Sequence, residues 1–258
     1  MKVFISKTSK ELGVNAAAHI ARQLRKIISV QNCARIVLST GASQFDTLGA
    51  LVKEDVDWRK VEVFHLDEYV GLSVTHPASF RKYLQERFVS QVPLKAFHPV
   101  NGEGNIIGNI RELSAEILSA PIDIGLIGIG ENAHIAFNDP PANFNTIDPY
   151  IIVDLNDSCK QQQVGEGWFK TIDAVPSQAI SMSVHQIMKC REIVCCVPDL
   201  RKADAIRQVL AANEVTNLIP ATKLKEHPCV WLYLDEASSS MVPAEVLKSY
   251  VKQEMTLE

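Results

Sequence analysis

Titratable and hydroxyl-bearing side chains follow short apolar segments at three places in the chain. Asp67 and Glu68 close the segment 60–68, and His134 follows the glycine-rich run 127–130. Carboxylates and imidazoles can move protons, and a loop of small hydroxyl residues can bind an anion. These residue types therefore suit proton transfer on a small anionic molecule. The loop in question consists of Ser39, Thr40, Gly41, Ala42 and Ser43.

The segment LSTGASQFDTL (38–48) has the composition of a phosphate-binding loop. Gly41 permits a tight turn, the small residues leave their N–H groups accessible, and a helix N-terminus adds partial positive charge. The segment is not a Walker loop, because neither GKS nor GKT follows. A simple strand-to-helix turn with a serine cap is the alternative interpretation.

Asp67 and Glu68 are adjacent carboxylates at the end of an apolar segment. Neighbouring residues of a strand point to opposite faces, so only one of the two can face a given pocket. Partial burial would raise the pKa of that carboxyl group and suit it to proton abstraction. The alternative is a solvated strand end or a helix cap.

The segment IGIGENAHIAFNDPPANFN (127–145) contains the pattern G-x-G-x-x-A, a weak signature of dinucleotide binding. We reject that use, because prolines 140 and 141 break any helix that would follow, and the segment lies in the middle of the chain. We expect a loop that presents His134, with Asn132 and Asp139 able to orient the imidazole ring. A purely structural histidine is the alternative.

Lys202 lies in the first turn expected after an apolar strand, with Asp199 as a plausible helix cap. A lysine near a helix start is unfavourable for the helix dipole, so a bound anion is one reason for its position. A solvated lysine is the other interpretation.

The elements that must position these residues alternate along the chain. Apolar periodicity near 3.6 residues predicts a helix over 10–30. Short, continuously apolar segments predict strands that helices cover on both faces, and hence a doubly wound, mostly parallel α/β sheet in a single domain over residues 1–258. Ligands bind such sheets beyond the carboxyl ends of the strands. The expected strands are 34–40, 60–68, 122–130, 192–198 and 229–236, and the further helices are 44–54, 78–89, 199–212 and 238–253.

Composition excludes several classes of function. The net charge of −4 argues against a broad basic face for nucleic acid. No apolar run reaches the ~18 residues of a membrane helix, and the first residues lack the apolar core of a secretory signal. The six cysteines form no CxxC pair, which favours free buried thiols in the cytoplasm. Metal-ligand spacing is absent, so we expect neither a metal nor a cofactor.

Taken in order, STGAS, LDEYVGL, HPASF, GIGENAHIAFNDP and the late PATKL and LDE segments resemble the glucosamine-6-phosphate deaminase (isomerase) family. Its superfamily also contains 6-phosphogluconolactonase. The resemblance covers about residues 36 to 240, and the DEYVGL and HIAFNDP motifs are specific to the deaminases. It implies a Rossmann-like fold that uses no nucleotide and the conversion of an amino-sugar 6-phosphate to a ketose 6-phosphate and ammonia.

The resemblance also implies roles for individual residues. Asp67 matches the aspartate that transfers a proton between C2 and C1, and His134 matches the histidine that helps to open the sugar ring. Residues 40–43 match the phosphate loop, with Ser39 beside them, and Lys202 matches a phosphate-binding lysine. The partner it implies is a small sugar phosphate, and the sequence leaves a homo-oligomer open.

Three positions depart from the family pattern. Asn132 stands where many members have Asp, Asp139 stands where Glu is common, and the segment 154–169 has no evident phosphate-binding Arg, although Lys160 lies within it. These departures indicate either another hexosamine phosphate, for example the galactosamine epimer, or a weak enzyme. A lactonase of the same superfamily and a non-catalytic sugar-phosphate sensor are the alternatives.

Overall fold

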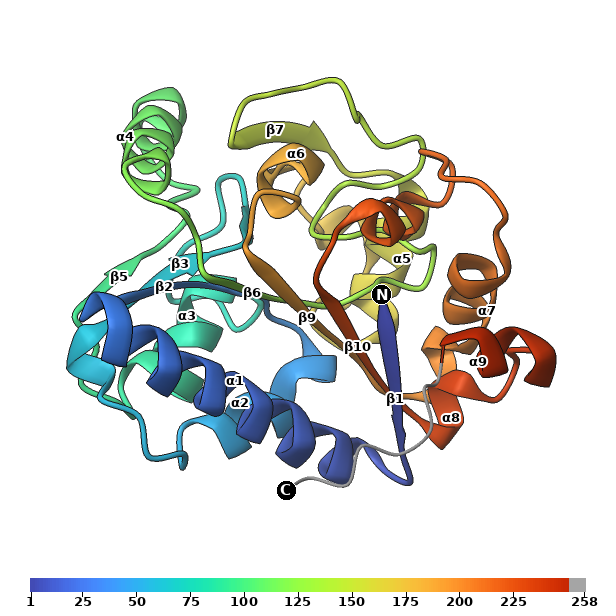
Figure 1. Ribbon diagram of the computed structural model, residues 1–258. Helices are drawn as coiled ribbons and strands as arrows, with labels where there is room; N and C mark the ends of the chain where they lie inside the picture. Colours follow the sequence, from blue (N-terminus) through green and yellow to red (C-terminus); the bar gives the residue numbers. More distant parts are fainter. Residues whose placement is uncertain (251–258) are drawn as a thin grey trace.

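A seven-stranded sheet in which every paired strand is parallel forms the centre of the computed structural model, which describes residues 1–250 (Figure 1). This confirms the mostly parallel α/β sheet that the sequence predicts. The strands in spatial order are β1 (Lys2–Ser6), β10 (Val230–Asp235), β9 (Glu192–Val197), β6 (Ile124–Ile127), β2 (Ala34–Leu38), β3 (Val61–His65) and β5 (Ala96–His98).

Helices cover both faces of this sheet, as a doubly wound arrangement requires (Figure 1). Along β2, Ile36 and Leu38 belong to one buried core, whereas Val37 belongs to the other. This alternation explains why the strand is apolar at every position, since both of its faces are packed. The first core includes residues of α1 (Ser9–Gln31), α2 (Phe45–Leu51) and α3 (Phe80–Leu84), and the second includes residues of α4 (Ile106–Leu118), α6 (Val184–Ile187) and α7 (Ala203–Ala211).

The predicted strand 60–68 is not one strand. The backbone changes partner at Leu66, whose N–H donates to the carbonyl of Leu38 in β2 while its carbonyl accepts from Met182. Beyond this point the chain enters a separate antiparallel sheet of three strands. The strands of this smaller sheet, in spatial order, are β4 (Asp67–Tyr69), β8 (Gln178–Met182) and β7 (Tyr150–Asp154), and α5 (Asp157–Gly165) follows β7 in the chain.

The N-terminal helix predicted over 10–30 is confirmed, and its local chemistry explains its limits. Thr8 caps the first turn by accepting from the N–H of Glu11, and Asn32 ends the helix in the left-handed conformation at a φ of 61°. The predicted cap at Asp199 is also present, because its carboxylate accepts from the N–H of Arg201.

Two other predicted helices are interrupted. The segment 78–89 forms α3 followed by one π-helical turn at Gln85–Val89. The segment 238–253 divides into α8 (Glu236–Ser239) and α9 (Ala244–Tyr250), with Pro243 between them, and its residues 251–253 lie outside the described residues. Within residues 1–250, no helix has both the length and the apolarity needed to cross a membrane.

Candidate active site

A cavity opens at the carboxyl ends of β2 and β6, where parallel α/β sheets bind their ligands. Its empty space of about 560 Å³ includes open solvent at its mouth. Most of the residues that the sequence analysis selected line it, although they come from distant segments. The lining consists of Ser39, Thr40, Gly41, Ser43, Leu66, Asp67, Phe80, Gly128, Ile129, Gly130, His134, Ala136, Phe137, Gln162, Gln163, Glu166 and Lys202.

The predicted anion loop forms one wall of the cavity. Gly41 has a φ of 95°, which is a left-handed conformation that residues with side chains rarely adopt. A short 3₁₀ turn at Ala42–Gln44 then leads into α2. Ser39, Thr40, Gly41 and Ser43 line the cavity, whereas Ala42 faces a neighbouring hollow on the other side of the loop. The hydroxyl of Ser39 has no hydrogen-bond partner among the described residues, so it is available to a ligand.

The side chains of Asp67 and Glu68 point to opposite faces of the strand, as those of neighbouring strand residues do. Asp67 lines the cavity, and burial, with the nearby charge of Glu68, raises the pKa of Asp67 to about 8. Glu68 points away from it, is fully buried, and accepts hydrogen bonds from Ser79 Oγ at 2.8 Å and from Arg81 Nε at 3.2 Å. The structure therefore places one carboxyl group of the pair in the cavity and uses the other to hold the start of α3.

His134 lines the same cavity, and its Nδ1 is occupied. Nδ1 lies 2.9 Å from Asp139 Oδ1 and 2.6 Å from Asn132 Oδ1, and Asn132 Nδ2 donates to Asp139 Oδ1 at 2.9 Å. Because Nδ1–H donates to these oxygens, Nε2 is the nitrogen left to exchange a proton with a ligand. Asp139, although one methylene shorter than Glu, reaches the ring.

Asp139 supplies the carboxylate of this group. Burial alone would raise the pKa of Asp139, but the hydrogen bond and charge of His134, helped by Asn132 and Cys159, bring this pKa below its usual value. The nearby Asn138, which the sequence also places among the polar groups of the loop, is buried elsewhere and donates to the carbonyl oxygens of Ile135 and Met182.

Glycine is required beside the imidazole. A Cβ atom built on Gly130 would lie 2.2 Å from Cε1 and Nε2 of His134, far inside van der Waals contact. The carbonyl of His134 also accepts from the N–H of Gly130 at 2.9 Å, which closes the turn. The glycines of the G-x-G-x-x-A pattern thus make room for a side chain, and no helix follows within 131–149, in agreement with our rejection of a dinucleotide site.

Lys202 reaches the cavity from the 3₁₀ turn after β9, whereas Arg201 does not line it. The Lys202 side chain is 7% exposed, and burial lowers the pKa of its ammonium group, which the charge of Glu166 partly offsets. Lys202 Nζ lies 3.8 Å from Glu166 Oε1. Lys160, the other lysine considered, is not among the residues that line the cavity.

Sequence reasoning missed the contribution of α5 and the residue that follows it. Gln162, Gln163 and Glu166 line the cavity next to Lys202. The available signal was the polar run of three glutamines at 161–163, which is unusual in a short helix. It could have indicated a binding surface, but not that this surface faces the anion loop.

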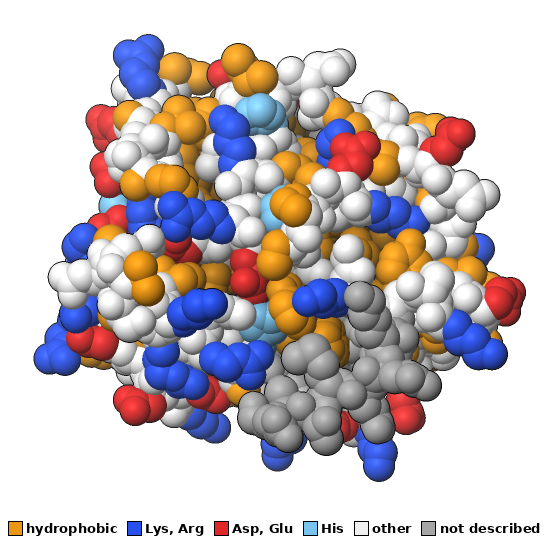
Figure 2. Space-filling view, viewed as in Figure 1, with side chains coloured by type: hydrophobic (Ala, Val, Ile, Leu, Met, Phe, Trp, Pro, Cys, Tyr) orange, Lys and Arg blue, Asp and Glu red, His pale blue; other side chains and the backbone are white. Residues whose placement is uncertain are grey.

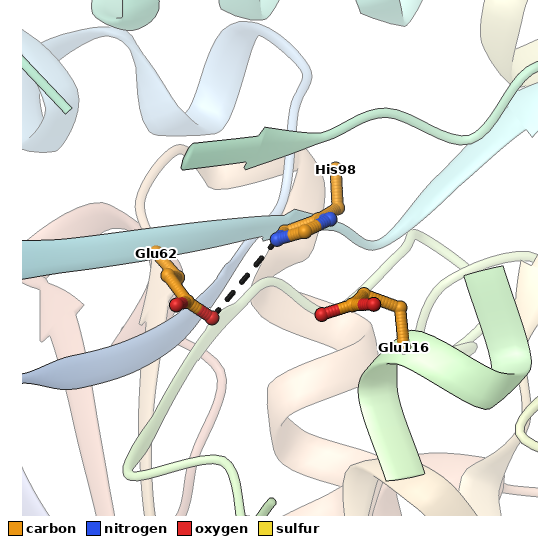
Figure 3. A group of neighbouring side chains, drawn as sticks. All are labelled: Glu62, His98 and Glu116. Atoms are coloured by element: carbon orange, nitrogen blue, oxygen red, sulfur yellow. Dashed lines mark ion pairs between the residues drawn. The ribbon is translucent and has the colours of Figure 1, made fainter. Parts of the chain in front are cut away.

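Three potential metal ligands meet outside the cavity (Figure 3). Glu62, His98 and Glu116 each offer an atom, and these atoms lie within 4.8 Å of one another. Spacing did not reveal the group, because its members come from β3, β5 and α4. Glu62 already pairs with Lys95 at 2.7 Å and with Arg35 at 3.3 Å, so a cation would have to compete with two resident positive charges. We therefore assign no metal to this group.

Surface charge and cysteines add little to the site. Lys and Arg side chains on the face shown in Figure 2 are interspersed with Asp and Glu. All six cysteines are free, as predicted, but Cys33 and Cys229 are partly exposed rather than buried.

Fold and site together define an α/β protein with an anion loop, a buried carboxyl group and an oriented imidazole in one cavity. A protein-family model described as glucosamine-6-phosphate isomerases/6-phosphogluconolactonase matches residues 7–231, and the chain belongs to this family. Among similar curated proteins, a glucosamine-6-phosphate deaminase of Staphylococcus saprophyticus is 34% identical over 233 residues, which cover 87% of this chain and 94% of the relative. A glucosamine-6-phosphate deaminase of Thermoanaerobacter pseudethanolicus is 31% identical, with 96% of this chain and 98% of the relative covered.

Solved structures support the same assignment. One, described as a monomeric glucosamine-6-phosphate deaminase, superposes with a TM-score of 0.86 at 28% identity, covering 93% of this chain and all of that chain. A 6-phosphogluconolactonase from Shewanella baltica has a TM-score of 0.73 at 19% identity, covering 91% of this chain and 96% of that chain. The second similarity concerns the fold alone.

Proposed function

We propose that this protein is an amino-sugar-phosphate deaminase, which converts a hexosamine 6-phosphate to a ketose 6-phosphate and ammonia. The observation that carries the proposal is that Asp67 and His134 face one cavity together with the loop 39–43 and Lys202. The names of the curated relatives support this reaction. Glucosamine 6-phosphate and its galactosamine epimer are the candidate substrates.

In the proposed mechanism, His134 assists ring opening and Asp67 transfers the proton. Nε2 of His134 would exchange a proton with the ring oxygen, while Asp139 and Asn132 hold the ring through Nδ1. Asp67 must be ionised to accept the C2 proton and would return it to C1, which converts the open-chain amino aldehyde to an imine at C2. Addition of water to this imine carbon then releases ammonia and leaves the ketone oxygen of the product. The substrate's own ammonium group would favour the ionised form of Asp67.

The phosphate group would anchor the substrate at a distance from the reacting carbons. Ser39, Thr40, Gly41, Ser43 and Lys202 line the cavity, and their N–H groups, hydroxyls and ammonium group would hold the phosphate. Binding energy from such a remote group orients the reacting atoms.

The whole chain is proposed to work as one domain, in the cytoplasm. Six free cysteines support a reducing compartment. One similar solved structure is described as a monomeric deaminase, so we infer that a single copy suffices for catalysis.

The decisive experiment measures ammonia and ketose phosphate released from glucosamine 6-phosphate and galactosamine 6-phosphate. Release from at least one epimer, lost in Asp67→Asn, is expected. Release from neither epimer would refute the deaminase assignment. Hydrolysis of 6-phosphogluconolactone, measured in parallel and lost in His134→Ala, would favour a lactonase instead. Thermal stabilisation by sugar phosphates without turnover would indicate a sensor.

A further inference from the structure

The end of the cavity that we assign to the phosphate has an unusual charge balance. Lys202 is the one Lys or Arg among the described residues that line the cavity, and Glu166 lines the same wall. The two charges lie 3.8 Å apart, between Lys202 Nζ and Glu166 Oε1. A dianionic phosphate placed beside Lys202 would therefore also meet a carboxylate.

Glu166 is held in this position from several sides. Its Oε1 accepts from Gln162 Nε2 at 2.9 Å, and its Oε2 accepts from Trp168 Nε1 at 3.1 Å. The side chain is only 8% exposed. Because both carboxylate oxygens are bonded and covered, the group does not simply turn toward solvent when an anion arrives.

Among the neighbouring charged groups, Arg201 is positive but does not line the cavity. Burial raises the pKa values of Tyr69 and Cys159, so both stay neutral and add no negative charge. Glu131, from the loop after β6, adds a second negative charge near Lys202 but does not line the cavity. The charged or titratable groups around the pair are Tyr69, Glu131, Cys159, Asp199 and Arg201, and those elsewhere on the cavity wall are Asp67 and His134.

We propose that Glu166 links phosphate binding to proton uptake: the substrate's phosphate ester binds as its monoanion, with a proton between a phosphate oxygen and the Glu166 carboxylate. This inference rests on the proposed function and names the form of substrate that the site selects. The proton comes from solvent, and no bond to carbon or phosphorus changes. Glu166 is thus a specificity-determining residue in the position where a simple phosphate site would have only positive groups.

A pH-dependent affinity follows from this arrangement. Phosphate esters lose their second proton near pH 6, so most of the free ligand is dianionic above neutrality. Binding as the monoanion must then take up a proton, and the dissociation constant should rise as the pH rises above about 6. A site that binds the dianion through Lys202 alone would not weaken in this range.

Calorimetry can count the protons directly. Glucosamine 6-phosphate is titrated into the Asp67→Asn variant, which prevents turnover, at about pH 8 in two buffers of different ionisation enthalpy. We expect uptake of about one proton per ligand bound. Adding Glu166→Gln should abolish this uptake and tighten binding by roughly tenfold, since one like charge is removed at short range.

Glu131→Gln is the matched control, because it removes a carboxylate that acts on Lys202 from outside the cavity. It should change affinity by less than about twofold and leave proton uptake intact. Glucosamine without phosphate should bind with no uptake. Persistent uptake in Glu166→Gln, or an affinity of the Asp67→Asn protein that is constant between about pH 6 and 8, would overturn the inference.

Failure of this inference can be told apart from failure of the deaminase assignment. If the protein with Asp67 intact releases ammonia but proton uptake is unchanged by Glu166→Gln, only the proposed role of Glu166 is refuted. Absence of both binding and reaction with hexosamine 6-phosphates overturns both proposals.

Discussion

Asp67 and Glu68 are neighbours in β4, yet Asp67 lines the candidate active site whereas Glu68 is fully buried outside it. Glu68 also contributes to the raised pKa of Asp67, after the larger effect of burial. Two identical functional groups thus acquire different environments from the alternation of a single strand. The predictions below begin with this pair.

Replacement of Asp67 by Asn should remove the proposed base and preserve the shape of the side chain. We expect ammonia release to fall by about 10²–10⁴-fold, the usual contribution of a positioned acid–base group. Affinity for the sugar phosphate should persist, as calorimetry can measure. Retention of more than about a tenth of the activity would exclude Asp67 as the proton-transfer group.

The pH profile should carry the signature of Asp67. Because the proposed base must be ionised, kcat/KM expressed per concentration of monoanionic substrate should rise with pH until about pH 8, where Asp67 loses its proton, and then level off. Steady-state rates measured across this range provide the test. An acid-side limb centred near the ordinary carboxyl pKa of 3.8 would contradict the assignment.

Stability should depend on pH through the same group. Folding raises the pKa of Asp67 from 3.8 to about 8, so the folded state binds more protons than the unfolded chain within this window. The stabilisation is complete below pH 3.8 and is lost as the pH rises through about 8. The difference in unfolding free energy between Asp67→Asn and the parent, measured by denaturant titration, should therefore shift in favour of the variant as the pH rises. A difference that is constant with pH would refute this.

Glu68→Ala should destabilise the protein, because it leaves the Arg81 guanidinium buried without its fully buried carboxylate partner. We expect a loss of about 3–5 kcal/mol in urea unfolding, as is usual when one member of a buried ion pair is removed. Glu103→Gln is the control, since Glu103 contacts the same Arg81 at 2.8 Å but its side chain is 42% exposed. Equal losses in both variants would show that burial of Glu68 is not what matters.

Gly130→Ala should displace the imidazole, since the added Cβ would overlap the His134 ring. Activity should fall by about 10²-fold, as expected for a misplaced reactive group. Gly49→Ala, inside α2, is the matched control, because a Cβ there meets nothing within 4 Å. Comparable activity in the two alanine variants would contradict the claim that a Cβ atom at position 130 displaces the His134 ring.

The sequence predicted those parts of the site whose residues lie close together in the chain. The alternation at Asp67 and Glu68 and the short loop that joins Asn132, His134 and Asp139 both depend on residues close in sequence. Glu166 could not be predicted in this way, because Lys202 lies in a distant segment, the turn after β9, and only the tertiary fold brings the two side chains together.

The fold shows the same division. Continuous apolarity predicted the central strands, but it carries no information on which strand each residue will pair with, so the break at Leu66 was missed. The helix α4 was not predicted either. It buries Leu113 and Ile117 but leaves Ile107 and Leu118 exposed, which blurs the apolar stripe that marks a helix.

The change of partner at Leu66 separates the two halves of the proposed chemistry. The carboxyl group that we propose as base is mounted on the small antiparallel sheet, one residue beyond this junction, whereas the loop that we propose as the phosphate anchor extends from the large parallel sheet. The distance between the phosphate-binding loop and Asp67 therefore depends on how the two sheets are placed relative to each other. A change in packing at their junction would alter which sugar carbon lies opposite Asp67.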